Sequence, residues 1–192
     1  MTLHRFDVQD LPAMPWKNGG GVTREIVCHP PDAGMNNFDW RVSIALIASD
    51  GPFSAFPGVD RIITLLSGGG VHLHSDDEKV NHPLDTPLAP FAFAGEAPVH
   101  ARLLAGDCQD LNVMTRRTTC SASLQVVRSA CDWPAAAQGL LMTVQGCWQL
   151  EGASSQTLTP QQGLWWSDAN MAWRLRPQSS DAALLALTLH FH

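Results

Sequence analysis

Short hydrophobic segments alternate with polar turns along almost the whole chain. Gly and Pro residues separate the segments, and hardly any stretch keeps a helical apolar period through three turns. Apolar runs that recur about every ten residues between turn-forming residues are typical of an all-β protein. The pattern predicts strands at residues 22–27, 40–48, 61–66, 71–74, 91–94, 99–104, 111–115, 123–128, 140–144, 148–150, 164–166 and 184–191.

One segment, residues 132–139, has the features of a short helix. Asp132 is a suitable N-cap, Pro134 fits a first helical turn, and three alanines follow before Gly139. A capping residue, an early proline and a terminal glycine favour helix formation. We therefore expect one short helix at most.

The two halves of the chain repeat a similar pattern. In each half an apolar strand leads through a glycine, Gly68 or Gly146, to a return strand, and a later strand carries an Arg-Leu pair at Arg102 or Arg174. Regular strand spacing alone also produces such matches, so a true repeat and a coincidence both stay open. We expect an N-terminal lobe over residues 1–117 and a C-terminal lobe over residues 118–192.

Charged and aromatic residues are distributed unequally between these lobes. Residues 1–117 carry 23 of the 30 charged side chains, whereas residues 118–192 carry 7 of them but five of the seven tryptophans. We expect the ligand pocket in the N-terminal lobe. The C-terminal lobe is expected to be mainly structural, or to form one side of an interface.

The overall composition narrows the range of partners. Of 192 residues, 45% are hydrophobic and 16% charged, which excludes a disordered chain. The formal net charge is −6 and no basic cluster is longer than Arg116-Arg117. Nucleic acids and anionic membranes attract positive surfaces, so neither is an expected partner. A small molecule is the better expectation.

The start of the chain lacks the apolar core of a signal peptide, and no run of about 18 apolar residues occurs. We therefore expect a cytoplasmic protein. Five cysteines with no Cys-x-x-Cys pair indicate reduced thiols rather than disulfides or a zinc site.

The segment Pro15-Trp16-Lys17-Asn18 followed by three glycines is the richest candidate motif. Successive glycines indicate left-handed backbone or a close approach to another group. A phosphate-binding loop would need wider spacing and a following helix. One interpretation places Lys17 and Asn18 at a pocket rim with Arg24 on the strand behind. In the other, the segment is a tight turn that leads into a strand, and its charged side chains are exposed to solvent.

A second candidate lies on the strand at 40–48. Alternation places Arg41 and Ser43 on one face, which is polar at one end. In a sheet closed into a barrel, an arginine there could hold a carboxylate with its planar fork. The alternative is an arginine paired at the surface with Asp39 or Asp60, which is the more common arrangement for any single arginine.

Asp110 and Asn112 form a third candidate pair. They lie two residues apart at the start of a predicted strand, so both side chains should share one face. Together they could accept and donate hydrogen bonds toward a ligand. The alternative is that they close a turn.

The run His72-Leu73-His74 followed by Glu78 reproduces the His-x-His-x3-Glu core of the first cupin metal motif. Two observations oppose a metal site. Leu66 stands where the motif has glycine, and Gln109 stands near the place of the histidine of the second motif. Because a divalent site with few ligands is weak, we expect no bound metal or other cofactor.

Taken together, three segments resemble the HutD/Ves family of bacterial cupin-like proteins. They are PWKNGGGVTREI, FDWRVSIALIASDGPFSAFPGVDRIITLLSGGG and AGEAPVHARLLAGDCQDLNVMTRR, and with the variable Trp-rich tail the resemblance covers nearly the whole chain. It implies an all-β bicupin fold without metal ligands. The His72-x-His74 pair departs from the family pattern. The family's shared motif residues fall on Trp16, Lys17, Asn18, Arg24, Arg41, Arg61, Asp110, Asn112 and Arg116.

The resemblance also implies two kinds of role. HutD-type members are associated with histidine utilisation and with a small carboxylate signal, such as urocanate, formylglutamate or formiminoglutamate, whereas Ves-type members are stress-induced proteins of unknown activity. We expect a non-catalytic binder of a small carboxylate, which Arg41 and Arg61 would hold, with Lys17, Asn18 and Arg24 lining the rim. We expect it to be a regulator or governor of histidine utilisation, and the sequence leaves a homodimer open. The alternatives are a metal-dependent isomerase or dioxygenase using His72, His74 and Glu78, and a protein-interaction module built on the tryptophans.

Overall fold

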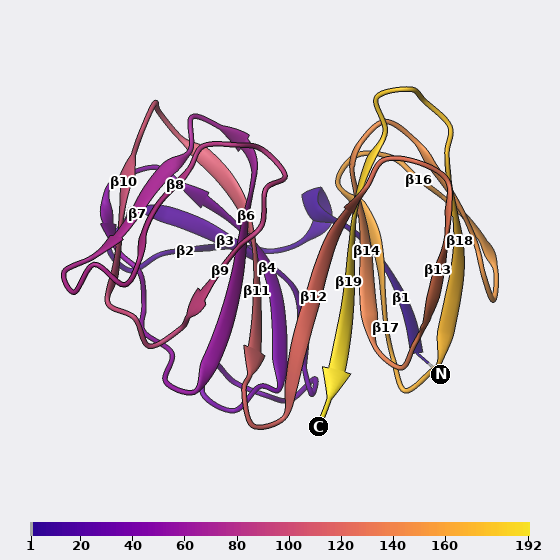
Figure 1. Cartoon of the computed structure of the whole chain (residues 1–192), viewed down its shortest axis with the longest axis horizontal. Helices are drawn as coiled ribbons and strands as arrows, with labels where there is room; N and C mark the ends of the chain where they lie inside the picture. Colours follow the sequence, from indigo (N-terminus) through magenta and orange to yellow (C-terminus); the bar gives the residue numbers. More distant parts are fainter. Residues whose placement is uncertain (1) are drawn as a thin grey trace. The chain divides into compact units, whose positions relative to one another are not determined.

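The computed structural model describes residues 2–192 and is built almost wholly of antiparallel strands (Figure 1). Within these residues the one helical element is a 3-10 turn, η1 (Val8–Asp10), so the all-β expectation is confirmed. No helix in the described part of the chain is long and apolar enough to cross a membrane. The chain divides into two compact units: unit 1 comprises residues 1–11 and 122–191, and unit 2 comprises residues 12–121 and 192.

Unit 2 contains a larger and a smaller sheet. The larger sheet has the strand order β2-β3-β4-β11-β6-β9, and the smaller has the order β5-β10-β7-β8. Ile63 and Leu65 of the larger sheet share one hydrophobic core with Leu73 and Ala101 of the smaller. The strands are β2 (Ala13–Pro15), β3 (Gly21–His29), β4 (Trp40–Ile47), β5 (Gly51–Pro52), β6 (Val59–Gly68), β7 (Val71–Ser75), β8 (Asn81–Leu84), β9 (Phe91–Ala94), β10 (Val99–Leu103) and β11 (Cys108–Arg116).

Unit 1 is also built from two sheets. Their strand orders are β1-β17-β14-β19-β12 and β13-β18-β15-β16. Strand β12 begins two residues before the unit boundary. The strands are β1 (Thr2–Asp7), β12 (Cys120–Val127), β13 (Cys131–Ala136), β14 (Gly139–Gln145), β15 (Trp148–Glu151), β16 (Ser155–Leu158), β17 (Gln162–Ser167), β18 (Met171–Pro177) and β19 (Ala183–Phe191).

The two units repeat one topology. Adding eight to the strand numbers of the order β5-β10-β7-β8 gives β13-β18-β15-β16, and the same shift turns β4-β11-β6-β9 into β12-β19-β14-β17. In both units the glycine that links the sheets, Gly68 or Gly146, has a positive φ, of 90° and 66° respectively. Such backbone favours glycine. The matching pattern in the sequence therefore corresponds to a repeated strand order.

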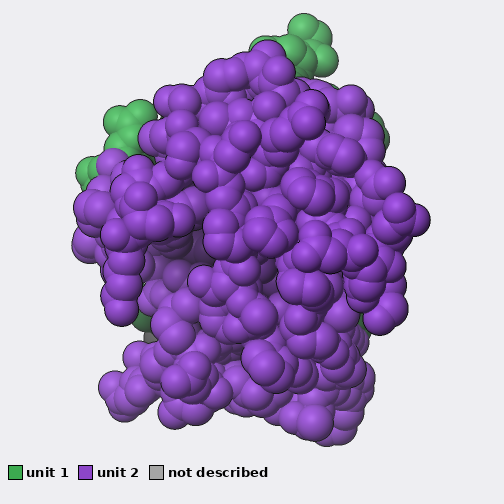
Figure 2. Space-filling view, turned by 90° about the vertical axis from the view of Figure 1, so that its left-hand side faces the viewer, with its two compact units in different colours: residues 1–11, 122–191 green, residues 12–121, 192 purple. Residues whose placement is uncertain are grey.

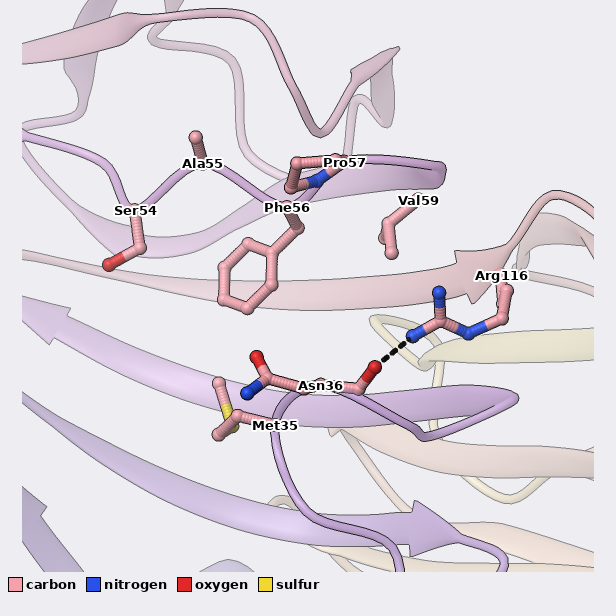
Figure 3. Close-up of a pocket in the computed structure, with 8 residues that line it drawn as sticks. All are labelled: Met35, Asn36, Ser54, Ala55, Phe56, Pro57, Val59 and Arg116. Carbon is pink, nitrogen blue, oxygen red and sulfur yellow. Dashed lines mark hydrogen bonds between the residues drawn. The ribbon is translucent and has the colours of Figure 1, made fainter.

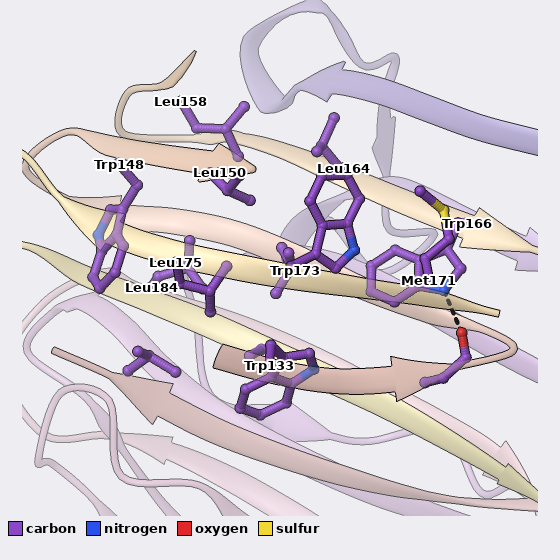
Figure 4. Close-up of a cluster of buried hydrophobic side chains, with 14 of the residues drawn as sticks. Trp133, Trp148, Leu150, Leu158, Leu164, Trp166, Met171, Trp173, Leu175 and Leu184 are labelled. Carbon is purple, nitrogen blue, oxygen red and sulfur yellow. Dashed lines mark hydrogen bonds between the residues drawn. The ribbon is translucent and has the colours of Figure 1, made fainter. Parts of the chain in front are cut away.

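The tryptophans of the C-terminal half fill the interior of unit 1 (Figure 4). Trp133, Trp148, Trp166 and Trp173 are buried in one cluster with leucines from both sheets. Trp165 instead stacks on His4, with 3.9 Å between ring centroids. Packing within the unit thus accounts for four of the five tryptophans.

The predicted helix at 132–139 is wrong, because residues Cys131–Ala136 form strand β13. Trp133 pairs with Trp173 of β18 and turns its ring into the core. Pro134 is tolerated because β13 is an edge strand and its pairing is irregular between Trp133 and Ala136. Burial of the indole therefore overrides the local helical preference of the alanines.

The division of the chain differs from the expected one at its N-terminus. Strand β1 pairs with β17 from Thr2↔Ser167 to Asp7↔Gln162, so residues 1–11 belong to unit 1. The Phe6 ring lies over Gly163, where any Cβ would collide with it. The first residues of the chain therefore complete the sheet of the C-terminal unit.

Candidate functional site

Three rows of residues cross the inward face of the larger sheet in unit 2. Strand β11 lies between β4 and β6, and residues opposite each other in a ladder share a face. The rows, one above the other, are Ala45–Asp110–Leu65, Ser43–Asn112–Ile63 and Arg41–Met114–Arg61. Leu65 and Ile63 belong to the core, which shows that this face is inward.

The charged members of these rows are buried. Arg41 is 5% exposed, Arg61 6% and Asp110 1%. In contrast, unit 1 buries no charged side chain among the residues that the structure describes. Because burying charge is costly unless it is paired, this concentration makes the interior of unit 2 the candidate site.

Arg41 is neutralised by neighbouring side chains. Its Nε donates to Glu25 Oε2 at 2.7 Å, and an Nη donates to Ser43 Oγ at 3.3 Å. The surface pairing with Asp39 or Asp60 that the sequence left open is therefore absent, and Glu25 of β3 takes that role. Arg41 already has its counter-ion.

Arg61 has no such counter-ion. Its Nε donates to Asn112 Oδ1 at 3.3 Å. Among residues 2–192 the structure shows no second hydrogen bond from this guanidinium. Phe53, Phe56 and Phe93 surround it, with ring centroids 5.0, 5.9 and 5.0 Å from Cζ. Burial lowers the pKa of Arg61 to about 10, against the opposing effect of Asp110. The side chain remains a cation, and no described carboxylate contacts its Nη groups.

Asp110 lies one row above Asn112. Its Oδ2 is buried and has no hydrogen-bond partner among the described residues. Burial raises the pKa of Asp110 to about 7, although the charge of Arg61 acts in the opposite direction. The carboxyl can therefore exchange a proton near neutral pH. Asp110, Asn112 and Arg61, predicted from the sequence, are brought together in one interior.

The loop before β3 contributes less than expected. Lys17 and Asn18 are exposed, and Asn18 Oδ1 accepts from the Gly20 N–H at 3.0 Å, which closes the turn. The Trp16 indole donates to Thr23 Oγ1 at 2.8 Å and packs against the core of unit 2. These contacts fix the turn that leads into β3, and no described contact joins Lys17 or Asn18 to Arg61.

Arg24 and Arg116 also lie apart from Arg61. Arg24 pairs with Ile44 in the ladder, on the opposite face of β3 from Thr23 and Glu25. The placement of Arg24 behind the rim of the same pocket is therefore wrong. The Arg116 guanidinium donates to the carbonyl oxygens of Phe38 and Asn36 and so fixes the loop between β3 and β4.

Arg116 also lines an open pocket of about 360 Å³ (Figure 3). Phe56 belongs both to the wall of this pocket and to the rings around Arg61. The surface of unit 2 is visibly recessed on the face seen in Figure 2. The other lining residues are Met35, Asn36, Ser54, Ala55, Pro57 and Val59.

The histidines of the metal-like motif face away from the hydrophobic core of unit 2. On β7, Val71, Leu73 and Ser75 are buried, so His72 and His74 occupy the outward face. His72 Nε2 lies 2.7 Å from Asn81 Oδ1, and the His74 ring lies near that of His100. Glu78 is exposed in the following turn. No group of three or more such side chains in the described chain could hold a metal ion.

The outward position of His72 gives a testable expectation. Its contact with the exposed Asn81 is a surface hydrogen bond, so His72→Ala should change the free energy of unfolding by less than about 1 kcal/mol. Protein purified without an affinity tag should contain well under one equivalent of transition metal. Elemental analysis and a thermal melt check both points, and stoichiometric zinc, iron or manganese lost in this variant would contradict them.

Sequence reasoning missed several residues of the site. Glu25 and the three phenylalanines were not singled out, although Phe53 and Phe56 precede Arg61 closely. Glu25 could have been found from the alternation of side chains along β3, which places Thr23 and Glu25 on the same face of the strand. The ring cluster had no sequence signal, because Phe93 comes from β9, next to β6 only in the folded sheet.

Comparison with known proteins gives consistent matches. Residues 8–185 match the HutD family model. Protein Ves of Cronobacter sakazakii is 43% identical over 171 residues, which span 88% of this chain and 90% of that protein. HutD from Pseudomonas fluorescens SBW25, determined in a formate condition, is 30% identical with a TM-score of 0.85 and full coverage of both chains.

A more distant match concerns the fold alone. A cupin 2 conserved barrel domain protein from Leptotrichia buccalis is 7% identical with a TM-score of 0.64, covering 97% of this chain and 96% of that one. The similarity supports a cupin fold for the arrangement of sheets described above.

Proposed function

We propose that this chain, which belongs to the HutD family, binds a small carboxylate at Arg61 of unit 2 and carries out no reaction on it. The observation that carries this proposal is the buried cation at Arg61, which has no carboxylate in contact among the described residues. A charge-assisted, bidentate hydrogen bond to a ligand carboxylate would give Arg61 the anionic partner that it lacks.

The surroundings of Arg61 support the same function. Asn112 holds the Nε edge of the guanidinium, so the Nη groups remain for the ligand. The three phenylalanine rings keep water away, which strengthens a charge-assisted bond. Arg41 is already bound to Glu25 and so does not compete with Arg61 for the ligand.

The family name links the proposed ligand to histidine utilisation. We propose that the bound carboxylate is a metabolite of that pathway, such as urocanate or formylglutamate, and that binding serves as a regulatory signal. Formate is the simplest probe of the site, and the P. fluorescens HutD was determined in a formate condition. The outward His72 and His74 give no support to the metal-dependent enzyme considered above.

Calorimetric titration of urocanate, formylglutamate and formate into the protein tests this proposal. At least one should bind at a single site below millimolar concentration. Arg61→Lys keeps the charge but loses the planar guanidinium that binds a carboxylate bidentately, so it should weaken binding by about tenfold to a hundredfold.

Arg24→Lys is the matched control, because Arg24 lies on the opposite face of its strand and should leave the affinity unchanged. If none of the three compounds binds, the proposed function is wrong. If one binds and Arg61→Lys does not weaken it, the ligand site lies elsewhere.

A further inference from the structure

Asp110 is a buried carboxyl group without a contacting cation. It is 1% exposed, and its Oδ2 has no hydrogen-bond donor among the described residues. An ionised carboxylate so placed would be stabilised only through space. Buried carboxyl groups without a partner favour the neutral acid.

The charges facing Asp110 come from three neighbouring strands and its own. Arg61 on β6 attracts the ionised form, and its effect is the main one opposing burial. Arg41 on β4 is neutralised by Glu25 on β3. Cys108 on β11 is a thiol whose pKa burial raises to about 11, so it stays neutral. Arg61 is therefore the one group that holds Asp110 partly ionised.

An anion bound to Arg61 changes this balance in one direction. It neutralises the positive charge that favours ionised Asp110, and it adds a negative charge to the same interior. Both effects favour the protonated acid. If the proton sits on Oδ2, which has no partner in the free protein, Asp110 can also donate a hydrogen bond to the ligand.

We propose that the carboxylate site of unit 2 takes up one proton together with its anion, and that Asp110 carries this proton. The inference rests on the proposed function, since it concerns the same site. It makes the protein a joint sensor of a carboxylate and of pH.

The sign of the effect follows from linkage. The free protein releases the Asp110 proton as pH rises through about 7, and the complex retains it to higher pH. Affinity should therefore be constant below about pH 6 and should fall toward tenfold per pH unit above about pH 8. Below neutrality no proton needs to be taken up, because Asp110 already holds it.

The experiment measures formate affinity by calorimetry from pH 5.5 to 8.5, in buffers with different ionisation enthalpies. Formate titrates well below this range, so any proton uptake belongs to the protein. Wild type should take up almost no proton at pH 5.5 and close to one at pH 8.5. Asp110→Asn, a neutral isostere, should bind formate with the same affinity at pH 5.5 and at pH 8.5.

Asp60→Asn is the matched control. Asp60 precedes Arg61 on β6, but its half-exposed carboxylate accepts from Arg117 on the surface. This variant should keep the wild-type pH dependence. If formate binding depends on Arg61 but its pH dependence survives in Asp110→Asn, the proton proposal is overturned and the proposed function stands. Loss of Arg61-dependent binding altogether would overturn the proposed function.

A measurement without ligand keeps the proton proposal testable if Asp110→Asn binds poorly. A carboxyl whose pKa is raised on folding loses its contribution to stability as pH rises from about 4 to about 7. The melting temperature of Asp110→Asn relative to wild type should therefore increase between pH 5 and pH 8. A constant difference across that range would show that Asp110 is ionised throughout, and would overturn the inference.

Discussion

Replacing Arg41 with methionine should cost the free protein about 2–4 kcal/mol of stability, whereas the same replacement at Arg61 should cost less than about 1 kcal/mol or raise stability. The two arginines are almost equally buried, at 5% and 6% exposure. They differ in their partners. Arg41→Met leaves Glu25 without its cation, whereas Arg61→Met removes a buried charge that no described carboxylate contacts.

The expected loss of stability for Arg41→Met is smaller than for breaking a fully buried ion pair, because the Glu25 side chain is 34% exposed and stays partly hydrated. Urea unfolding of the two variants measures the difference. Adding Glu25→Gln to Arg41→Met should recover part of the loss, since no unpaired charge remains. Equal losses for the two single variants would contradict the pairing scheme, and carboxylate binding should be lost only where Arg61 is changed.

A larger loss is expected from Trp148→Ala in unit 1. Trp148 is fully buried in the cluster of Figure 4, and removal of a buried tryptophan side chain typically costs about 3–5 kcal/mol. Its indole N–H has no acceptor within residues 2–192, so the loss comes from packing and not from a hydrogen bond. Trp148→Phe should therefore cost much less.

Trp165→Ala is the control for this prediction. Trp165 is only partly buried and stacks on His4, so its loss should be about 1 kcal/mol. Denaturant unfolding followed by circular dichroism compares the three variants. A loss for Trp148→Ala no larger than that for Trp165→Ala would show that this cluster does not stabilise unit 1.

The strands and the inward face could be predicted from local patterns. Alternation along β4 placed Arg41 and Ser43 on one face, and that face is the interior. Sequence reasoning failed at β13, where the alanines and Asp132 favour a helix in isolation. There the decisive contact is between Trp133 and Trp173, whose strands are far apart in the sequence.

The electrostatics of the site could not be read from the chain in the same way. Arg41 and Arg61 look equivalent in the sequence, and only the ladder shows that one meets Glu25 and the other meets Asn112. Arg24 looked like a third member of the group. Its exclusion follows from its place opposite Ile44, on the face of β3 away from Thr23 and Glu25. Strand periodicity fixes a face, but partners across strands are set by register.

The pairing of β1 with β17 has a consequence for synthesis on the ribosome. Strand β1 emerges first, yet its partner Ser167 is translated about 165 residues later, which at about 5–20 residues per second takes roughly 8–33 s. Residues 12–121 of unit 2 are complete before then. During this interval the nascent chain carries β1 without its partner strand, and such an unpaired strand is where chaperones or neighbouring chains can pair.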